Sequence, residues 1–303
     1  MKFSIFQDSR KGTRASNQDR TGYSYTRDAL LMVVADGMGG HLHGEVAAHI
    51  AVQFLSEAFQ REAQPRLVDP FLFLLENISS AHHAILDYAE TRGLLETPRT
   101  TCVACVVQDS DACWAHVGDS RLYHVRGGRI HAQTRDHSRV QMLLDQGRIR
   151  EEAAAAHPDR NKIFNCLGSM TPPQVELSRK TVLQPGDTLL LCSDGLWGPL
   201  PGRAIGVALA GEDIMRVVPE LLDAAERRAG RVCDNLSVVA MTWADCNEAS
   251  THQVSTATLG PSTFTTELEE YGRAGNTLTD LSDAEIEQAV AEIRNAIRRH
   301  WSK

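Results

Sequence analysis

The residues best suited to chemistry in this sequence are aspartates that adjoin apolar runs and small or turn-forming residues. They occur in Asn17-Gln18-Asp19, Ala35-Asp36-Gly37, Gly118-Asp119-Ser120, Ser193-Asp194-Gly195 and Asp234-Asn235. An Asp at the end of a buried strand points into a shared opening, and a following Gly lets the backbone carbonyl approach a cation. Carboxylate, carbonyl and water ligands suit Mg²⁺ and Mn²⁺, whereas Zn²⁺ favours the Cys and His that these segments lack. We therefore predict an all-oxygen metal centre in one cleft.

Several carboxylates in a cleft of low dielectric constant repel each other strongly unless cations neutralise them. Two ions about 3.5 to 4 Å apart can hold a bridging water, lower its pKa and stabilise the attacking and leaving oxygens of an in-line phosphoryl displacement. The competing interpretation is that each Asp is a turn or capping residue, which is the commoner role of any single Asp-Gly pair. The recurrence of Asp beside apolar runs favours the shared metal centre.

The composition indicates one globular domain. The chain has 303 residues, 42% of them hydrophobic, and a net charge of −8 without a basic run, so a nucleic-acid partner is not expected. No apolar stretch approaches the roughly 18 residues of a membrane span. The first residues, MKFSIFQDSRKG, lack the apolar core of a signal peptide, so we expect a cytoplasmic protein.

The cysteines and histidines do not suggest a disulfide framework or a zinc site. Seven cysteines is an odd number, and Cys102 and Cys105, although spaced as CxxC, lie in a strand-like run where their side chains point to opposite faces. None of the twelve histidines has the spacing of a zinc-binding helix motif.

Short apolar runs bounded by Gly, Asp or Ser predict the strands that must position the aspartates. These runs cover residues 29–35, 102–107, 112–117, 121–125, 188–192 and 236–242. Apolar stripes at helical spacing predict helices across 46–58, 71–88 and 214–225. The segment ACWAHVGDSRLYHV, residues 112–125, suggests an antiparallel hairpin. The pattern fits an α+β sandwich of sheet and helix layers within one domain, residues 1–245.

The chain changes character after Trp243. Residues 246–280 are rich in Ser and Thr and poor in apolar side chains, which predicts a flexible linker. Residues 281–303 begin with a capping box, Ser282 with Glu285, and carry an apolar stripe that ends at Trp301. We expect an amphipathic C-terminal helix that either docks onto a partner, such as a kinase or its substrate, or packs on its own domain.

A longer series of motifs surrounds the aspartates. Along the chain run Gly12-x-Arg14-x-x-Asn17-Gln18-Asp19, Ala35-Asp36-Gly37-Met38-Gly39-Gly40-His41 with Gly44-Glu45, Thr100-Thr101, Gly118-Asp119-Ser120-Arg121, Asp136-His137-Ser138, Ser193-Asp194-Gly195-Leu196 and Asp234-Asn235. In this order they resemble the PPM family, the type 2C metal-dependent serine/threonine protein phosphatases, in its bacterial form. An ordered set of this size is far less prone to chance matches than one short motif.

The resemblance implies a four-layer α/β/β/α sandwich in which two antiparallel sheets are flanked by pairs of helices. It also implies a flap subdomain at about residues 136–173 that shapes the choice of substrate. Within the site, Asp36 matches the ligand that bridges two Mg²⁺ or Mn²⁺ ions, and the Gly37 carbonyl matches a ligand of the first ion. Asp194 and Asp234 match the ligands of the second ion.

The same resemblance assigns the remaining polar positions. Asp19 matches the residue that holds metal-bound waters, and Asp119 together with Asp194 matches a third, weaker metal site. Arg14 matches the guanidinium that grips the substrate phosphate, a role for which its planar fork of donors is suited.

One position leaves the leaving-group proton without an assigned donor. Eukaryotic members have a His two residues after the bridging Asp as a proposed general acid, and here that position is Met38. The candidates are His41 and a water on the third metal. A His between glycines in a turn is as often a structural hydrogen-bonding residue.

The expected function is hydrolysis of phosphoserine and phosphothreonine in proteins, in opposition to a bacterial serine/threonine kinase. The alternatives are a phosphoprotein-binding pseudophosphatase and a phosphoesterase that acts on small molecules. The intact aspartates argue against the pseudophosphatase. The motifs recognise phosphate and metal and do not distinguish protein from small-molecule substrates.

Overall fold

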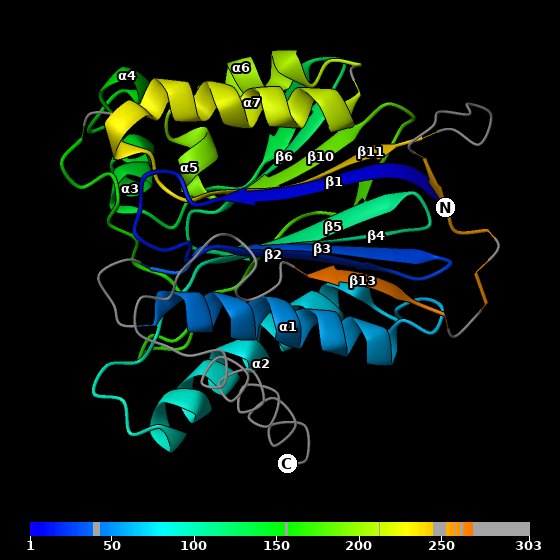
Figure 1. Cartoon of the computed structure of the whole chain (residues 1–303), viewed down its shortest axis with the longest axis horizontal. Helices are drawn as coiled ribbons and strands as arrows, with labels where there is room; N and C mark the ends of the chain where they lie inside the picture. Colours follow the sequence, from blue (N-terminus) through cyan, green and yellow to red (C-terminus); the bar gives the residue numbers. More distant parts are fainter. Residues whose placement is uncertain are drawn as a thin grey trace.

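The computed structural model describes residues 1–38, 43–154, 157–211, 213–244, 253–257, 259–260 and 263–268. Two antiparallel sheets stack face to face (Figure 1). The first sheet has the strand order β12 (Val254–Ser255), β1 (Lys2–Arg10), β11 (Leu236–Trp243), β10 (Thr188–Cys192), β6 (Arg121–Arg126) and β7 (Arg129–Gln133). The second has the order β13 (Thr265–Leu268), β2 (Arg20–Tyr25), β3 (Ala29–Ala35), β4 (Cys102–Gln108), β5 (Asp111–Val117) and β8 (Glu176–Leu177), and β9 (Thr181–Val182) also pairs with β5.

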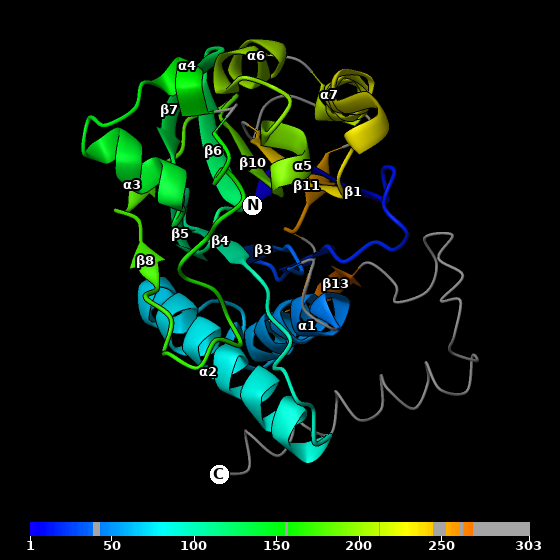
Figure 2. The same cartoon turned by 90° about the vertical axis from the view of Figure 1, so that its left-hand side faces the viewer.

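Helices cover the outer face of each sheet (Figure 1, Figure 2). The second sheet packs against α1 (Gly44–Glu62) and α2 (Pro70–Thr91). The first packs against α5 (Asp194–Trp197), α6 (Gly202–Ala208) and α7 (Ile214–Ala229), the last of which leads into a 3₁₀ turn at Gly230–Val232. The four-layer α/β/β/α sandwich predicted from the sequence is confirmed.

The alternation of side chains along the strands explains why these layers form. In β3, the residues at odd positions pack against α1 and α2, whereas Leu30, Met32 and Val34 pack between the two sheets. All of these side chains are fully buried. Because complete burial of an aliphatic side chain of this size contributes about 1.5 to 3 kcal/mol, a strand that is apolar on both faces is stable only between two layers.

Two of the three long helices, α2 and α7, begin at capping aspartates. Asp69 accepts hydrogen bonds from the backbone N–H groups of Phe71 (2.9 Å) and Leu72 (3.1 Å), and Pro70 occupies the first turn of α2. Asp213 accepts from the N–H of Met215 (3.0 Å) at the start of α7. The helices predicted across 46–58, 71–88 and 214–225 are confirmed.

The strand predictions are correct in position but incomplete. Each of the six predicted runs is a strand in the structure. The strands β1, β2 and β7 were not predicted, because each contains only a few apolar residues among polar ones.

The predicted hairpin across residues 112–125 is wrong. β5 belongs to the second sheet and β6 to the first, so the chain crosses between the sheets at Gly118-Asp119-Ser120. The apolar runs show that both strands are buried, but they do not show which sheet each strand joins. The crossing places Asp119 between the two sheets.

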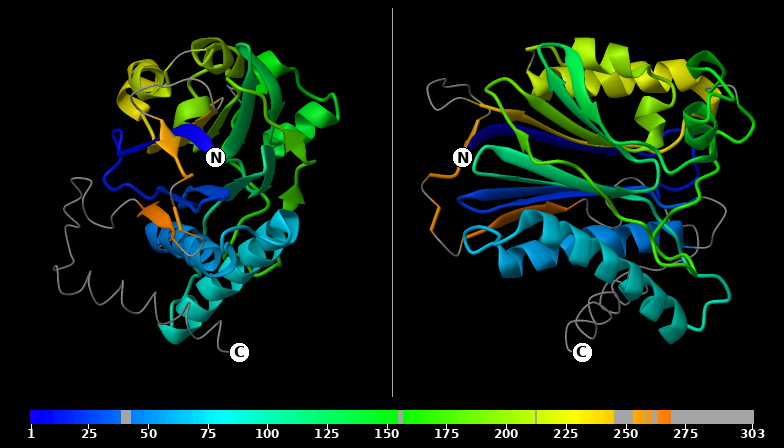
Figure 3. Two further views of the ribbon diagram at one scale, coloured as in Figure 1. Left: turned by 90° about the vertical axis from the view of Figure 1, so that its right-hand side faces the viewer. Right: turned by 180° about the vertical axis from the view of Figure 1, so that it is seen from behind.

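The predicted linker at 246–280 is also partly wrong. β12 pairs with β1, and β13 pairs with β2, so this segment adds an edge strand to each sheet (Figure 3). Thr256 is fully buried, and its hydroxyl donates to the carbonyl of Arg27 (2.6 Å). The unpaired backbone groups of β1 and β2 supply hydrogen-bond partners for these short strands. The predicted C-terminal helix at 281–303 lies outside the described residues.

The predicted flap segment, residues 136–173, contains α3 (Arg139–Asp145) and α4 (Glu151–Ala154). Its two ends meet, since Ser138 pairs with Ile163 and the N–H of Arg139 donates to the carbonyl of Lys162 (2.8 Å). A role for this segment in substrate choice stays a prediction.

The cysteines of the described part of the chain are buried and unpaired. Cys102 packs towards α1 and α2 and Cys105 packs between the sheets, so the two side chains point to opposite faces of β4 as predicted. Among the described residues, no helix is both long and apolar enough to cross a membrane.

Candidate active site

The predicted aspartates gather at one end of the strands, beside α5 at the left of Figure 1. Asp36 follows β3, Asp194 follows β10 and Asp234 precedes β11. Asp19 lies between β1 and β2, and Asp119 lies between β5 and β6. Both of these connections pass from one sheet to the other, so the cluster is assembled from both sheets.

Electrostatic repulsion within the cluster is strong. Burial raises the pKa of Asp36 well above its ordinary value, and the neighbouring carboxylates raise it further: Asp19, Asp194, Asp119 and Asp234. Burial also raises the pKa of Asp194, again with contributions from Asp119, Asp234 and Asp19. These groups therefore lie close enough together to oppose each other's ionisation.

The supporting carboxylates show the same behaviour. Burial raises the pKa of Asp19 to about 6, although a short hydrogen bond from the Ser193 hydroxyl (2.6 Å) favours its ionised form. Burial raises the pKa of Asp119 to about 7, and the nearby Asp136 contributes to the increase. Ionisation of all these carboxylates is unfavourable in the protein alone. Divalent cations bound among them would neutralise their charge.

The backbone beside Asp36 is held in place by neighbouring loops. The carbonyl of Asp36 accepts from the N–H of Thr101 (2.9 Å) and the hydroxyl of Thr100 (2.8 Å). A Cβ atom at Gly37 would lie 2.5 Å from the backbone of Gly44 and 2.6 Å from the carbonyl oxygen of Gln18. Only glycine fits here, as expected where a backbone carbonyl must lie near the metal centre.

Arg14 lies at the exposed rim of the cluster. Its Nη2 donates to Asp234 Oδ2 at 2.6 Å, and the two side chains are 54% and 31% exposed. This hydrogen bond, together with the charges of Asp194 and Asp36, raises the pKa of Arg14. The guanidinium has five N–H donors, so one bond to Asp234 leaves donors for a phosphate.

The cluster fits a centre of hard divalent cations. Its potential ligands are carboxylate and carbonyl oxygens, the set that Mg²⁺ and Mn²⁺ prefer. Arg14 relieves this repulsion only in part: among the described residues it lowers the pKa of Asp194, which burial and the other carboxylates still raise overall.

Comparison with known proteins agrees with this chemistry. A family model described as protein phosphatase 2C matches residues 7–228. The chain belongs to the protein phosphatase 2C family. It is 35% identical to the serine/threonine phosphatase stp of Listeria welshimeri over 224 residues, which are 73% of this chain and 86% of the relative.

Solved structures of family members have the same fold. The serine/threonine phosphatase Stp1 from Staphylococcus aureus has a TM-score of 0.72 and 30% identity, and the match covers 80% of this chain and 95% of that structure. The catalytic domain of the phosphatase PstP in complex with two manganese ions has a TM-score of 0.66 and 31% identity, covering 80% of this chain and all of that one.

In this 2C-type phosphatase, the cluster is also held by residues to which the sequence analysis gave no role. Ser193 donates to Asp19 and accepts from the N–H of Ser237 (3.0 Å). Asn235 donates to the carbonyls of Lys11 (2.8 Å) and Ser16 (3.0 Å), so it anchors the connection that carries Arg14 and Asp19. Ser193 and Asn235 lie directly beside Asp194 and Asp234 in the sequence, and this was the signal that could have identified them as supporting residues.

A second group of potential metal ligands lies near the flap segment. Side-chain ligand atoms of His116, His137 and Glu176 lie within 4.8 Å of one another. However, His137 Nδ1 accepts a hydrogen bond from the backbone N–H of Gly118 (3.1 Å), so its Nε2 must carry the ring proton. A protonated Nε2 has no lone pair for a metal, and we do not assign a metal site to this group.

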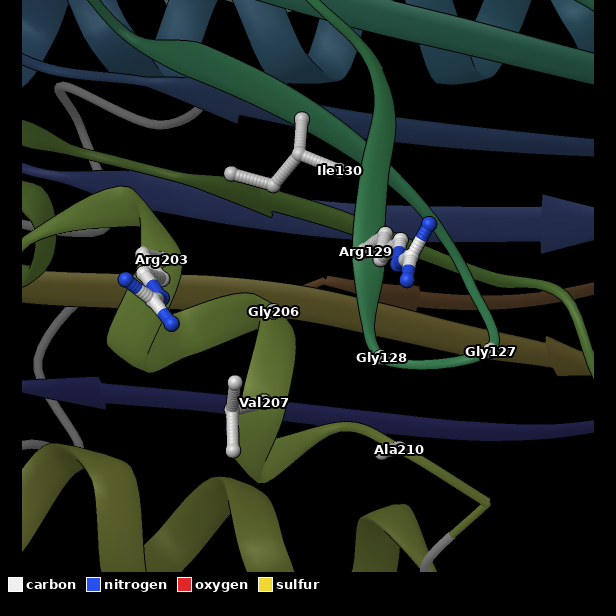
Figure 4. Close-up of a pocket in the computed structure, with 8 residues that line it drawn as sticks. All are labelled: Gly127, Gly128, Arg129, Ile130, Arg203, Gly206, Val207 and Ala210. Atoms are coloured by element: carbon white, nitrogen blue, oxygen red, sulfur yellow. The ribbon is translucent and has the colours of Figure 1, made fainter.

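A pocket lined by residues of β7, α6 and the β6–β7 turn is separate from the cluster. It has a volume of about 490 Å³ and lies between the β6–β7 turn and α6 (Figure 4). Arg129 and Arg203 line it together with glycines and apolar side chains, and none of its lining residues is acidic. It contains none of the predicted site residues.

One predicted site residue, His41, lies outside the described part of the chain.

Proposed function

We infer that this chain is a Mg²⁺- or Mn²⁺-dependent phosphatase that hydrolyses phosphoserine and phosphothreonine in proteins. The observation that carries this inference is the set of buried carboxylates that raise one another's pKa at one end of the sandwich. The names of the relatives as serine/threonine phosphatases support the same reaction and substrate class.

We propose unequal roles for the aspartates, on the family pattern. Asp36 would bridge two cations, with the Gly37 carbonyl as a further ligand of the first, and Asp194 and Asp234 would hold the second. When bound, the cations supply charge neutralisation and an attacking water of lowered pKa. Asp19 would orient water molecules, and its hydrogen bond from Ser193 supports an ionised, accepting carboxylate there.

Arg14 would bind the phosphate of the substrate. It lies at the rim with only one of its donors engaged by Asp234, and its charge is opposite to that of the phosphoryl oxygens. Asp119 would share a third, weaker cation with Asp194. The effect of Asp119 on the pKa of Asp194 supports this, because it places the two carboxylates in one electrostatic environment.

The inference is tested by phosphate release from a phosphothreonine peptide and from p-nitrophenyl phosphate with Mn²⁺. We expect activity that EDTA and Asp36→Asn both abolish. Binding of the phosphopeptide without turnover would identify a pseudophosphatase. Turnover of small phosphate esters but of no phosphoprotein would identify the small-molecule phosphoesterase. Activity that survives both EDTA and D36N would refute the metal mechanism.

For the leaving-group proton, we propose His41 as one donor and a water on the third cation as the other. The two are separated by H41Q and D119N, assayed with phosphoserine and with p-nitrophenyl phosphate. A seryl oxygen needs protonation more than the acidic p-nitrophenolate does, so loss of the general acid slows only the phosphoserine reaction. Equal slowing of both substrates by both variants would exclude both donors.

We further propose a cytoplasmic location and a bacterial serine/threonine kinase as the opposing enzyme. Comparison of phosphorylation sites in cells with and without this chain, each with the kinase present and absent, tests the pairing. Sites that rise without the phosphatase only when the kinase is present would support it. The same rise in cells without the kinase would contradict it.

The helix predicted at 281–303 is proposed to dock onto a partner. A truncation after residue 268 removes it while keeping β12 and β13, which pair with β1 and β2. Unchanged activity, stability and kinase capture in this truncation would exclude docking. The matched truncation after residue 244 also removes both edge strands, and it should lower stability whichever role the helix has.

A further inference from the structure

His137 connects the flap segment to the Gly118-Asp119 turn. Its backbone N–H donates to the carbonyl of Gly118 (3.0 Å), and its Nδ1 accepts from the N–H of the same glycine (3.1 Å). Both backbone polar groups of Gly118 are thus bound to one residue. The His137 side chain is only 11% exposed. This double contact fixes the peptide units on either side of Gly118, the second of which leads into Asp119.

The ring of His137 has a defined tautomer. Nδ1 also accepts from Asn165 Nδ2 (2.8 Å), whose amide orientation is set because its Oδ1 accepts from the N–H of Gln174 (3.0 Å). With two donors at Nδ1, the ring proton lies on Nε2, which donates to Glu176 (3.2 Å). His116 stacks on the ring at 4.6 Å between centroids and holds its plane.

No residue other than glycine fits at position 118. Its φ of +102° is in the region that favours glycine, and a Cβ atom would lie 2.6 Å from the side chain of Thr101. A glycine in such a turn has many accessible conformations unless its backbone groups are bound. His137 provides those bonds.

A second set of contacts holds the other side of Asp119. Trp197 Nε1 donates to the carbonyl of Asp119 (3.0 Å), and the Arg121 guanidinium lies over the indole ring at 3.6 Å from its centroid. Asp136, which precedes His137, accepts two hydrogen bonds from Arg121 (2.8 and 2.7 Å). His137 therefore holds the chain before Asp119, at Gly118, and Asp136 holds it after Asp119, at Arg121.

The same histidine joins the two ends of the flap segment. Asn165 binds His137 and also donates to the carbonyl of Gln174 (2.7 Å). The N–H of Phe164 donates to the carbonyl of His137 (3.0 Å). Any displacement of the flap base would move the residue that binds Gly118.

We propose that His137 is a positioning residue for Asp119: through its Nδ1 it orients the Asp119 carboxylate towards its cation, and it couples the position of the flap base to that cation. The proposal rests on the role of Asp119 as a metal ligand in the proposed function. This role requires no contact between His137 and the substrate. Partners that orient a metal ligand in this way affect metal affinity or activity by about ten- to a hundredfold.

Two isosteric variants separate the two ring nitrogens. In His137→Asn, the side-chain oxygen occupies the place of Nδ1 and can still accept from Gly118. In His137→Gln, the amide reaches the place of Nε2 and can still bind Glu176, but nothing accepts from Gly118. Glu176→Gln is the matched control, because it alters only the contact at Nε2.

The measurement is calorimetric titration of chelator-treated full-length protein with Mn²⁺, in which Asp119→Asn identifies the binding step that depends on Asp119. We expect H137Q to weaken that step about ten- to a hundredfold. H137N and E176Q should keep the wild-type dissociation constant. The proposal would be overturned by any of three results. H137N and H137Q could have equal effects, E176Q could have an effect as large as that of H137Q, or D119N could leave the Mn²⁺ titration the same as in the wild type.

Two further readouts keep the test decisive. Thermal unfolding of each variant shows whether it folds. If H137Q does not fold, the ¹⁵N chemical shifts of the His137 ring in the wild-type protein test the proposal instead. A proton on Nε2 and an accepting Nδ1 are expected, and a proton on Nδ1 would overturn the proposal. The titration needs no phosphorylated substrate, so an inactive wild-type protein would count against the proposed function alone.

Discussion

Two aspartates flank the short strand β10, and their surroundings are opposite. Asp187 precedes the strand and is 1% exposed, yet hydrogen bonds from Arg126, the N–H of Gln184 and His124 outweigh its burial and lower its pKa. The Arg126 contacts are 2.8 and 2.6 Å long. Asp194 follows the strand, and burial and neighbouring carboxylates raise its pKa.

The difference separates a structural charge from a functional one. The charge of Asp187 is neutralised by the chain itself, so it stabilises the fold. The charge of Asp194 must be neutralised mainly by a bound cation. Strongly perturbed carboxylates with unfavourable mutual interactions are typical of functional sites, whereas paired ones are typical of the scaffold. Substitution of each by its neutral isostere should therefore give opposite results.

The largest expected effect is that of Asp194→Asn on activity. Loss of a ligand that supports several kcal/mol of transition-state stabilisation should reduce Mn²⁺-dependent turnover of p-nitrophenyl phosphate about a thousandfold. In EDTA, the same variant should unfold at a higher temperature than the wild type, because it removes a self-repelling charge. A D194N protein that is both active and less stable in EDTA would contradict the comparison.

Asp187→Asn should show the reverse pattern. It leaves Arg126 and His124 without their buried partner, and loss of one member of a buried pair costs about 3 to 5 kcal/mol of unfolding free energy. Because the Arg126 side chain is 30% exposed, we expect the lower end of that range. Urea denaturation measures the loss, and turnover per folded molecule should stay at the wild-type value.

The pH dependence of stability without metal sharpens the comparison further. Asp19 and Asp119 have folded-state pKa values of about 6 and about 7, against about 3.9 in an unfolded chain. Between these pKa values the folded state binds more protons than the unfolded state does. The free energy of unfolding therefore falls as pH rises from about 4 to about 7. Melting temperatures in EDTA should decrease over this range, and D194N should flatten the slope. A melting temperature that rises with pH would refute the raised pKa values.

The smallest expected effect is that of Arg14→Lys. Lysine keeps the charge but loses the planar fork, so the KM for a phosphothreonine peptide should rise about tenfold, equivalent to about 1.4 kcal/mol. Arg10→Lys is the matched control, because Arg10 lies in the preceding strand and pairs with Asp8, Asp223 and Glu226. A KM that changes equally in both variants would exclude a specific phosphate contact for Arg14.

The sequence by itself determined the central strands, the long helices and the identity of the acidic cluster. The run at 29–35 is apolar at every position, so it predicts a strand buried on both faces with Asp36 at its end. Asp-Gly and Asp-Asn steps at other strand ends repeat the same local signal. Such features depend on neighbours in the chain, which a sequence displays directly.

Only the tertiary structure decided how the two sheets share the site. The pattern at 112–125 is compatible with a hairpin or with a crossing, because an apolar run indicates burial but not the partner strand. The edge strands β12 and β13 form where β1 and β2 offer unpaired backbone groups, and their own residues give little sign of it. Likewise, the contact between His137 and Gly118 joins residues 19 positions apart. Contacts of this kind arise from packing between distant segments, and packing is a property of the folded chain.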